Sequence, residues 1–239
     1  MSGHSKWHNI QQRKGKQDAK RSASFSKHAK LISVAARNGG DPEKNFSLRL
    51  AIDRAKIDGV PKDNIERAIK SGTGELKGSI IEELTYECYG PGGVAILINA
   101  VTDNKNRTLP EIKHILSKNG GSLGSSGSVL WMFERCGVVV IDKGFISDRD
   151  EFELTMMDAG AEDIVEVEGN KVQIKTKPEN LQAAVEKAKE LGVEVSDSGL
   201  EWVAKEKVKV EPEIENKLNN LFGFLTEHDD VEDFYTNAE

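Results

Sequence analysis

The spacing of apolar residues along the chain is helical at first and changes to that of strands after Gly72. Between residues 25 and 69, apolar side chains recur at every third or fourth position, as on the buried face of a helix. Glycines at 39–40, 59 and 72 interrupt this spacing, and glycine commonly ends a helix because it adopts the left-handed conformation without strain. Asp41-Pro42 and Pro61 are typical helix starts. The pattern predicts three short helices.

After Gly72, short apolar runs alternate with turn residues, which is the pattern of strands joined by hairpins and loops. Glu83–Tyr89 and Val94–Val101 flank Gly90-Pro91-Gly92-Gly93 and predict a β-hairpin. Thr108-Leu109-Pro110-Glu111 has the form of a capping box, with Thr at the N-cap, and predicts a helix that ends at Asn119. A strand is expected over Val129–Glu134, so residues 82–134 supply the order ββαβ.

Residues 137–203 contain a full set of elements in the order βαββαβ, which is the ferredoxin-like arrangement. The expected strands cover Val138–Ile141, Ile164–Val167, Val172–Lys175 and Val193–Val203, and the expected helices cover Asp148–Met157 and Leu181–Leu191. The tail then offers an amphipathic helix, Glu213–Leu225, and a strand, Val231–Tyr235. We expect these two elements to complete the sheet begun by residues 82–134.

The sequence therefore predicts an α+β fold, with an N-terminal three-helix domain followed by two ferredoxin-like α/β domains, the last inserted in the middle one. The expected boundaries are a basic arm at 1–24, a helical domain at 25–79, a discontinuous domain at 80–136 plus 204–239, and an inserted domain at 137–203.

Charge is distributed very unevenly along this chain. The first forty residues hold nine Lys or Arg against one acid, Asp18, a net charge of +8 in a protein whose total is −7. Residues 75–239 carry −16. Such a basic segment in an acidic protein is typical of binding to a polyanion, most often nucleic acid. The acidic part should face away from bound nucleic acid, because it would be repelled by the phosphates.

We expect the cations of this segment to neutralise phosphates and its aromatic rings to stack on bases. An alternative for Trp7 is docking on the helical domain, and an alternative for the whole segment is a solvated tail or a localisation signal. The candidate nucleic-acid-binding residues are His4, Lys6, Trp7, Arg13, Lys14, Lys16, Lys20, Arg21, Lys27 and Lys30.

Other kinds of site have little support in the sequence. His4 and His8 have helical spacing for a zinc site, but no third ligand lies near them, so we expect no metal. The loop from Gly121 to Ser128 lacks the Lys of a P-loop, and its GXXG pattern is a weak KH signature; a functional loop and a simple connector are both possible. No catalytic arrangement is present, and we expect no enzyme activity, cofactor or small-molecule substrate.

The remaining features favour a reducing, cytoplasmic compartment. Cys88 and Cys136 are too far apart in sequence for a CxxC motif, and free buried thiols are expected. The N-terminus has no secretory signal pattern, and the longest apolar runs have the length of strands, so no membrane association is expected.

Several motifs resemble those of the YebC/PmpR family. They are Gly-His-Ser-Lys-Trp at 3–7, Gln-Asp-Ala-Lys-Arg at 17–21, Pro-Lys-Asp-Asn-Ile-Glu-Arg-Ala-Ile at 61–69, Tyr-Gly-Pro-Gly-Gly-Val-Ala at 89–95 and Asp-Asn-Lys-Asn-Arg-Thr at 103–108. The resemblance implies three domains, a bacterial cytoplasmic location and no enzymatic activity. Members are usually described as probable transcriptional regulators that bind DNA. Mitochondrial relatives act as translational activators, and bacterial ones have been tied to the ribosome and the synthesis of proline-rich stretches.

Together these observations indicate a non-enzymatic, nucleic-acid-binding regulator of gene expression, with DNA as the target of a transcriptional regulator. The first alternative is a ribosome-associated translation factor that binds ribosomal or transfer RNA. The second is a protein-interaction scaffold, in which the basic arm engages an acidic protein.

Overall fold

The computed structural model describes residues 17–76, 81–146, 148–167 and 169–239, with side chains from Ser24 onward. These residues form two compact units. One comprises residues 130–209 and 235–239, and the other comprises the described residues before Leu130 together with residues 210–234. Within the described ranges, no helix is long and apolar enough to cross a membrane.

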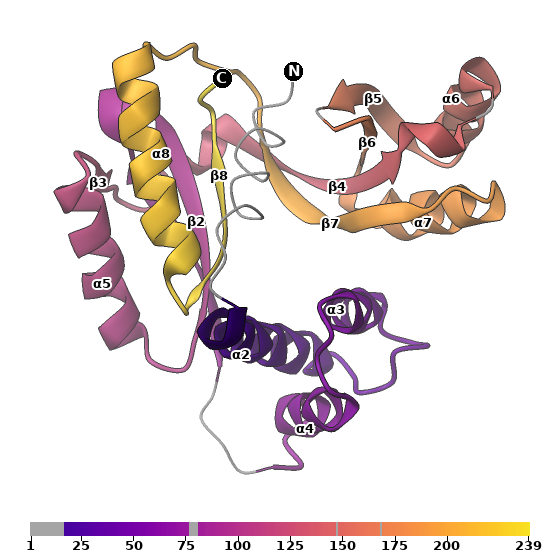
Figure 1. The fold of residues 1–239 in the computed structure, drawn as a ribbon, viewed down its shortest axis with the longest axis horizontal. Helices are drawn as coiled ribbons and strands as arrows, with labels where there is room; N and C mark the ends of the chain where they lie inside the picture. The colour runs from indigo at the N-terminus through magenta and orange to yellow at the C-terminus, as the bar shows by residue number, and fades with distance from the viewer. Residues whose placement is uncertain (1–16, 77–80, 147, 168) are drawn as a thin grey trace. The chain divides into compact units, whose positions relative to one another are not determined.

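In the part of the chain that the structure describes, three helices precede the first sheet (Figure 1): α2 (Gln17–Ala36), α3 (Phe46–Ile57) and α4 (Lys62–Gly72). Helix α2 contacts both of the others. Their apolar stripes meet in one buried cluster that includes Ile32 of α2, Leu48 of α3 and Ala68 of α4. The three-helix region expected from the sequence is therefore confirmed.

Helix α3 begins later than the sequence indicates. The expected start is Asp41-Pro42, but the N-cap is Asn45, whose side-chain oxygen accepts the N–H of Leu48 at 3.1 Å. The Asn45 amide nitrogen also donates to the carbonyl oxygens of Ala35 and Gly39, each at 2.8 Å. One side chain thus caps α3 and fixes it to the end of α2, which a capping pattern alone does not reveal.

The first sheet has the strand order β3-β1-β2-β8. Its strands are β1 (Glu82–Tyr89), β2 (Ala95–Thr102), β3 (Ser122–Leu123) and β8 (Val231–Thr236). A short 3₁₀ turn at Pro91–Gly93 joins β1 to β2, which pair antiparallel as expected from the hairpin pattern. Helices α5 (Lys105–Lys118) and α8 (Pro212–Glu227) contact each other and lie side by side on this sheet (Figure 1). The tail therefore returns to the first sheet, as predicted.

Two details of this region differ from expectation. Helix α5 starts at Lys105 with Asn104 as its N-cap, so the predicted capping box at Thr108 is wrong. The reason is that the Thr108 hydroxyl donates to a buried carboxylate, that of Asp230. The strand expected over Val129–Glu134 is also wrong, because the strand that joins this sheet is β3 in the glycine-rich loop, and Phe133 already belongs to the next sheet.

The second sheet has the strand order β5-β6-β4-β7, with antiparallel neighbours throughout. Its elements follow one another without interruption in the order βαββαβ: β4 (Phe133–Asp142), α6 (Arg149–Asp158), β5 (Ala161–Val167), β6 (Lys171–Thr176), α7 (Leu181–Glu190) and β7 (Val195–Ala204). Gly137 lets α7 approach the sheet, because a Cβ at this position would lie 2.8 Å from that of Leu181. The predicted α+β class, with a three-helix region followed by two four-stranded sheets and their helices, is confirmed, and the second sheet has the predicted ferredoxin-like order.

Candidate nucleic-acid interface

The predicted nucleic-acid-binding residues fall partly outside the described residues and partly on helix α2. His4, Lys6, Trp7, Arg13, Lys14 and Lys16 lie outside the described residues. Lys20 and Arg21 belong to α2, while their side chains lie outside the description. Lys27 and Lys30 are the predicted site residues whose side-chain contacts are described, and they lie one turn apart on α2.

Lys27 contacts the C-terminal end of α8. Its Nζ donates to the carbonyl oxygen of Thr226 at 3.1 Å. Burial lowers the pKa of Lys27, while the carboxylates of Asp229, Asp233 and Asp230 act in the opposite direction. The side chain of this lysine is thus directed toward acidic groups of its own chain.

Lys30 forms an ion pair with a carboxylate that is almost fully buried. Its Nζ lies 2.6 Å from Oδ1 of Asp230, whose side chain is 2% exposed, and also donates to the Asp229 carbonyl oxygen at 3.3 Å. The Lys30 side chain itself is 20% exposed. The structure therefore gives both lysines partners within the chain.

Asp230 collects donors from three further side chains at its other oxygen. Arg107 Nη2 and Thr108 Oγ1 each lie 2.7 Å from Oδ2, and Thr102 Oγ1 lies 3.1 Å from it. Burial alone would raise the pKa of Asp230, but the hydrogen bonds from Arg107, Lys30 and Thr108 hold that pKa well below its ordinary range. We call Asp230, Lys30, Arg107, Thr108 and Thr102 the Asp230 cluster.

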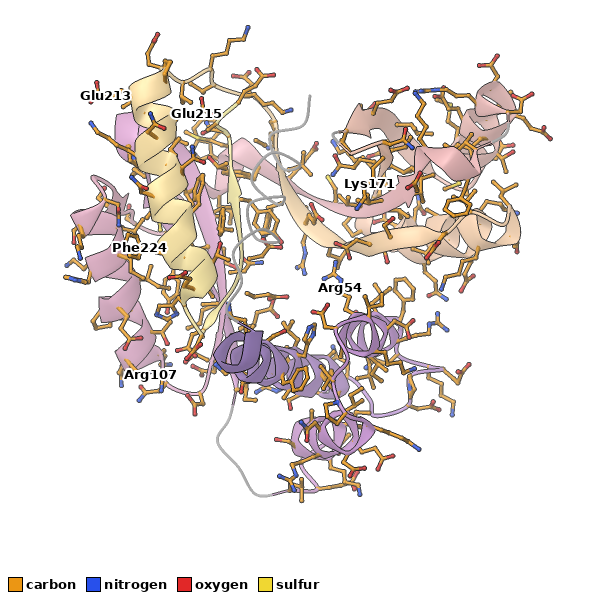
Figure 2. The ribbon with its side chains drawn as sticks, in the orientation of Figure 1. Arg54, Arg107, Lys171, Glu213, Glu215 and Phe224 are labelled. Atoms are coloured by element: carbon orange, nitrogen blue, oxygen red, sulfur yellow. The ribbon has the colours of Figure 1, made fainter. Side chains whose placement is uncertain are left out.

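The Asp230 cluster joins segments that are far apart in sequence: α2, the end of β2, the start of α5 and the turn before β8. Figure 2 shows Arg107 at the N-terminal end of α5, shortly after the chain leaves β2. The imidazole of His228 supports the same turn, since its Nδ1 accepts the N–H of Asp230 at 3.1 Å and its Nε2 lies 3.2 Å from Oε2 of Glu111. Sequence reasoning missed this cluster, because adjacent acids such as Asp229-Asp230 give no sign of which one is buried.

The charged segment Asp103–Arg107 has structural roles. Asn104 caps α5, and Arg107 bridges Asp103 and Asp230 at 3.3 and 2.7 Å. Lys105 pairs with Glu82 at 3.5 Å. These contacts account for the mixture of charges and turn formers seen in the sequence.

The glycine-rich loop is fixed to the first sheet by a buried acid. The Glu87 carboxylate accepts the N–H of Gly127 at 2.5 Å and that of Val129 at 2.7 Å, and the Glu87 carbonyl oxygen accepts the N–H of Gly124 at 2.7 Å. A phosphate cradle needs such N–H groups for its anion. Because a side-chain carboxylate already takes two of them, the cradle interpretation of this loop loses its support.

The cysteines and the possible metal ligands offer no reactive centre among the described residues. Cys88 and Cys136 are free and buried. Burial raises the pKa of Cys88 to about 12 and that of Cys136 to about 11. No group of three or more potential metal ligands occurs in the described ranges, and the pair His4 and His8 lies outside them.

Comparison with known proteins gives matches along nearly the whole chain. Residues 5–75 match the model described as "TACO1/YebC protein N-terminal domain", and residues 81–238 match "TACO1/YebC second and third domain". A probable transcriptional regulatory protein of Natranaerobius thermophilus is 49% identical over 242 aligned positions, covering 100% of this chain and 96% of the relative. One from Kosmotoga olearia is 50% identical over 240, covering 100% and 94%.

A solved structure agrees with the fold. The crystal structure of a conserved hypothetical protein from Aquifex aeolicus superposes with a TM-score of 0.85 and 41% sequence identity. The match covers 95% of this chain and 93% of that protein. The order of one helical region and two α/β sheets is therefore shared with an experimentally determined structure.

Proposed function

Because this chain belongs to the TACO1/YebC family, whose curated relatives are named probable transcriptional regulatory proteins, we propose that it is a non-enzymatic regulator of gene expression that binds DNA. The observation that carries the proposal is the concentration of nine cations in the first forty residues of an otherwise acidic protein. The basic arm and the start of α2 are the proposed contact.

The roles of the residues follow from their chemistry. Lys6, Arg13, Lys14, Lys16, Lys20 and Arg21 neutralise phosphates, which supplies affinity and position without sequence information. His4 and Trp7 stack on exposed bases or sugars. Lys27 and Lys30 lie further along α2, where their ammonium groups contact acceptors of the chain itself, so phosphate binding is assigned to the six cations that precede them. The net charge of −16 beyond residue 74 keeps the rest of the protein away from the phosphates.

Binding measured against salt tests this proposal. The affinity of the full chain for a labelled duplex DNA of mixed sequence is determined by fluorescence anisotropy at several salt concentrations. Replacing Lys14, Lys16, Lys20 and Arg21 together by Ala removes up to four phosphate contacts, and should reduce the slope of log affinity against log salt by about 3 to 4.

A matched control removes the same charge from the second sheet and its helices, through Lys171→Ala, Lys177→Ala, Lys187→Ala and Lys189→Ala. This variant should keep the wild-type salt slope. If the arm variant binds DNA as the wild type does, or if both variants lose the same slope, the arm is not the binding element. A wild-type chain that binds neither duplex DNA nor RNA but pulls down an acidic protein would support the scaffold alternative instead.

A second candidate function is RNA binding during translation. The mixture of His4 and Trp7 with cations suits single-stranded or irregular RNA better than a duplex groove, because unstacked bases offer their faces to aromatic rings. Sedimentation through a sucrose gradient at moderate salt separates the two candidates. Migration with ribosomal particles favours RNA, whereas promoter footprints without such migration favour DNA.

A further inference from the structure

We propose that Asp230 is a positioning residue for nucleic-acid binding, which fixes the direction of α2, and with it Lys20 and Arg21 near the start of that helix, through its contact with Lys30. This inference rests on the proposed function, since it explains how the basic start of α2 is oriented for binding. Asp230 lies in the turn before β8 and does not belong to the basic segment. Its effect on nucleic acid would be indirect.

The contacts of Lys30 are those of an internal anchor. A lysine ammonium has three protons to donate, and the side chain of Lys30 is 20% exposed. One proton is directed to Asp230 Oδ1 at 2.6 Å and another to the Asp229 carbonyl oxygen at 3.3 Å. If Lys30 bound a phosphate instead, the buried carboxylate of Asp230 would lose one of its two cationic partners. Burying a charge without such compensation destabilises the fold.

The carboxylate is held from the opposite side by α5 and β2. Arg107, Thr108 and Thr102 donate to Oδ2. These bonds fix the orientation of the carboxylate, so that its Oδ1 points toward Lys30 of α2. An apolar contact between helices tolerates sliding and rotation. An ion pair with one fixed partner selects a single residue of α2, and specifying geometry is the best-attested use of buried polar groups. Lys27, which donates to the Thr226 carbonyl oxygen, fixes the same helix one turn away.

The neighbouring acid provides a matched control for charge. Asp229→Asn and Asp230→Asn change the net charge equally, at adjacent positions. Asp229 is exposed, and the contact that it makes with Lys30 uses its backbone carbonyl, which the substitution retains. If Asp230 acted only through its charge, its loss would reduce repulsion and strengthen binding to DNA. A positioning role predicts the opposite sign.

The experiment uses the full chain and a labelled duplex DNA of mixed sequence, with affinity measured across salt concentrations. Asp230→Asn and Lys30→Met should each weaken binding about fivefold, the low end of ordinary coupling between sites, with the salt slope unchanged. Lys30→Arg should retain wild-type affinity, because a guanidinium reaches the same carboxylate oxygen. Asp229→Asn should not weaken binding. Thermal melting and circular dichroism establish that each variant is folded.

A second measurement reports on α2 without any nucleic acid. Spin labels at Ser26→Cys on α2 and Asn220→Cys on α8 give a distance distribution by double electron–electron resonance. Asp230→Asn and Lys30→Met should broaden this distribution, and Lys30→Arg should leave it narrow. The spin-label reagent should not react with the two native cysteines, because both are buried.

The outcomes separate the two proposals. If the wild type fails to bind DNA or RNA, the proposed function is wrong, and the distance distributions still decide whether Asp230 fixes α2. If Lys30→Met lowers the salt slope by about 0.9 with an unchanged distance distribution, Lys30 contacts a phosphate and the positioning role is wrong. Stronger binding by Asp230→Asn would overturn it as well.

Discussion

The side-chain carboxylate of Glu87 accepts the backbone N–H of Val129, with Oε2 and the nitrogen 2.7 Å apart. Its other oxygen accepts the N–H of Gly127, so one buried side chain closes the glycine-rich loop onto β1. We expect Glu87→Ala to lower the free energy of unfolding by about 1–3 kcal/mol, because the buried N–H of Val129 and the partly buried N–H of Gly127 lose their acceptor. Chemical denaturation measures this loss.

The same variant should expose the loop locally. The amide of Val129 should exchange with deuterium faster in Glu87→Ala than in the wild type. Glu83→Ala, at an exposed position of the same strand, is the control and should change neither quantity. Equal exchange rates at Val129 in all three proteins would mean that the carboxylate does not hold the loop.

Two glycine substitutions should have opposite effects on stability. Gly72 ends α4 where it touches α2: a Cβ there would clash with the Ser33 carbonyl oxygen and lie 2.7 Å from the Ala36 Cβ. Gly72→Ala should therefore destabilise the protein by about 1–3 kcal/mol. Gly223 lies within α8 with nothing within 4 Å of an added Cβ, so Gly223→Ala should stabilise it by about 0.5–1 kcal/mol. Urea denaturation midpoints of both variants check the signs.

Asp230 should make the protein sensitive to acid. Hydrogen bonds outweigh the effect of burial and hold the pKa of Asp230 below that of an unfolded aspartate, about 3.9. Its contribution to stability is therefore present above about pH 4 and is lost as pH falls through the lower folded pKa. Asp230→Asn should be less stable than the wild type at neutral pH and should lose less stability on acidification.

The melting temperatures of the wild type and of Asp230→Asn are measured from neutral pH down to the lowest pH at which both proteins fold. The other carboxylates are common to both proteins, so the difference between the curves reports on Asp230. Parallel curves over the whole range would show that this carboxylate has the same pKa in the folded and unfolded chains.

The two cysteines should be inert in the folded protein. Burial raises the pKa of Cys88 to about 12, so at pH 8 about one thiol in ten thousand is ionised at this position. We expect a colourless thiol reagent such as iodoacetamide to modify neither cysteine in native buffer and both in guanidinium, as mass spectrometry would show. Rapid native labelling of Cys136, which is 3% exposed, would indicate local opening of β4.

The sequence was sufficient to predict those parts of the fold in which local periodicity and burial coincide. The helical spacing around Ile32 and Ala36 and the order βαββαβ of residues 133–204 follow from patterns within short windows. The return of the tail to the first sheet follows from the elements that residues 82–134 lack. The domain boundaries expected near residues 24, 79, 136 and 203 stay a prediction.

The errors lie where a distant residue determines a local structure. The sequence around Thr108 resembles an N-cap, but the Thr108 hydroxyl donates a hydrogen bond to Asp230, and Asn104 caps the helix instead. The apolar run at Val129 looks like a strand, but Glu87 takes its N–H group and the next strand starts at Phe133. Of the candidate binding residues, sequence reasoning selected Lys27 and Lys30 for their charge, and charge does not reveal which cations already have buried partners.

The position of β8 also affects the order in which the chain acquires its structure during synthesis. The ribosome makes β1, β2 and α5 well before β8, with the whole of the second sheet in between. The second sheet is continuous in sequence and can fold as soon as β7 emerges, whereas the first sheet waits for its fourth strand. Lys30 likewise has to wait for Asp230. Helix α2, although made before both sheets, is therefore among the last of the described elements to gain its final contacts.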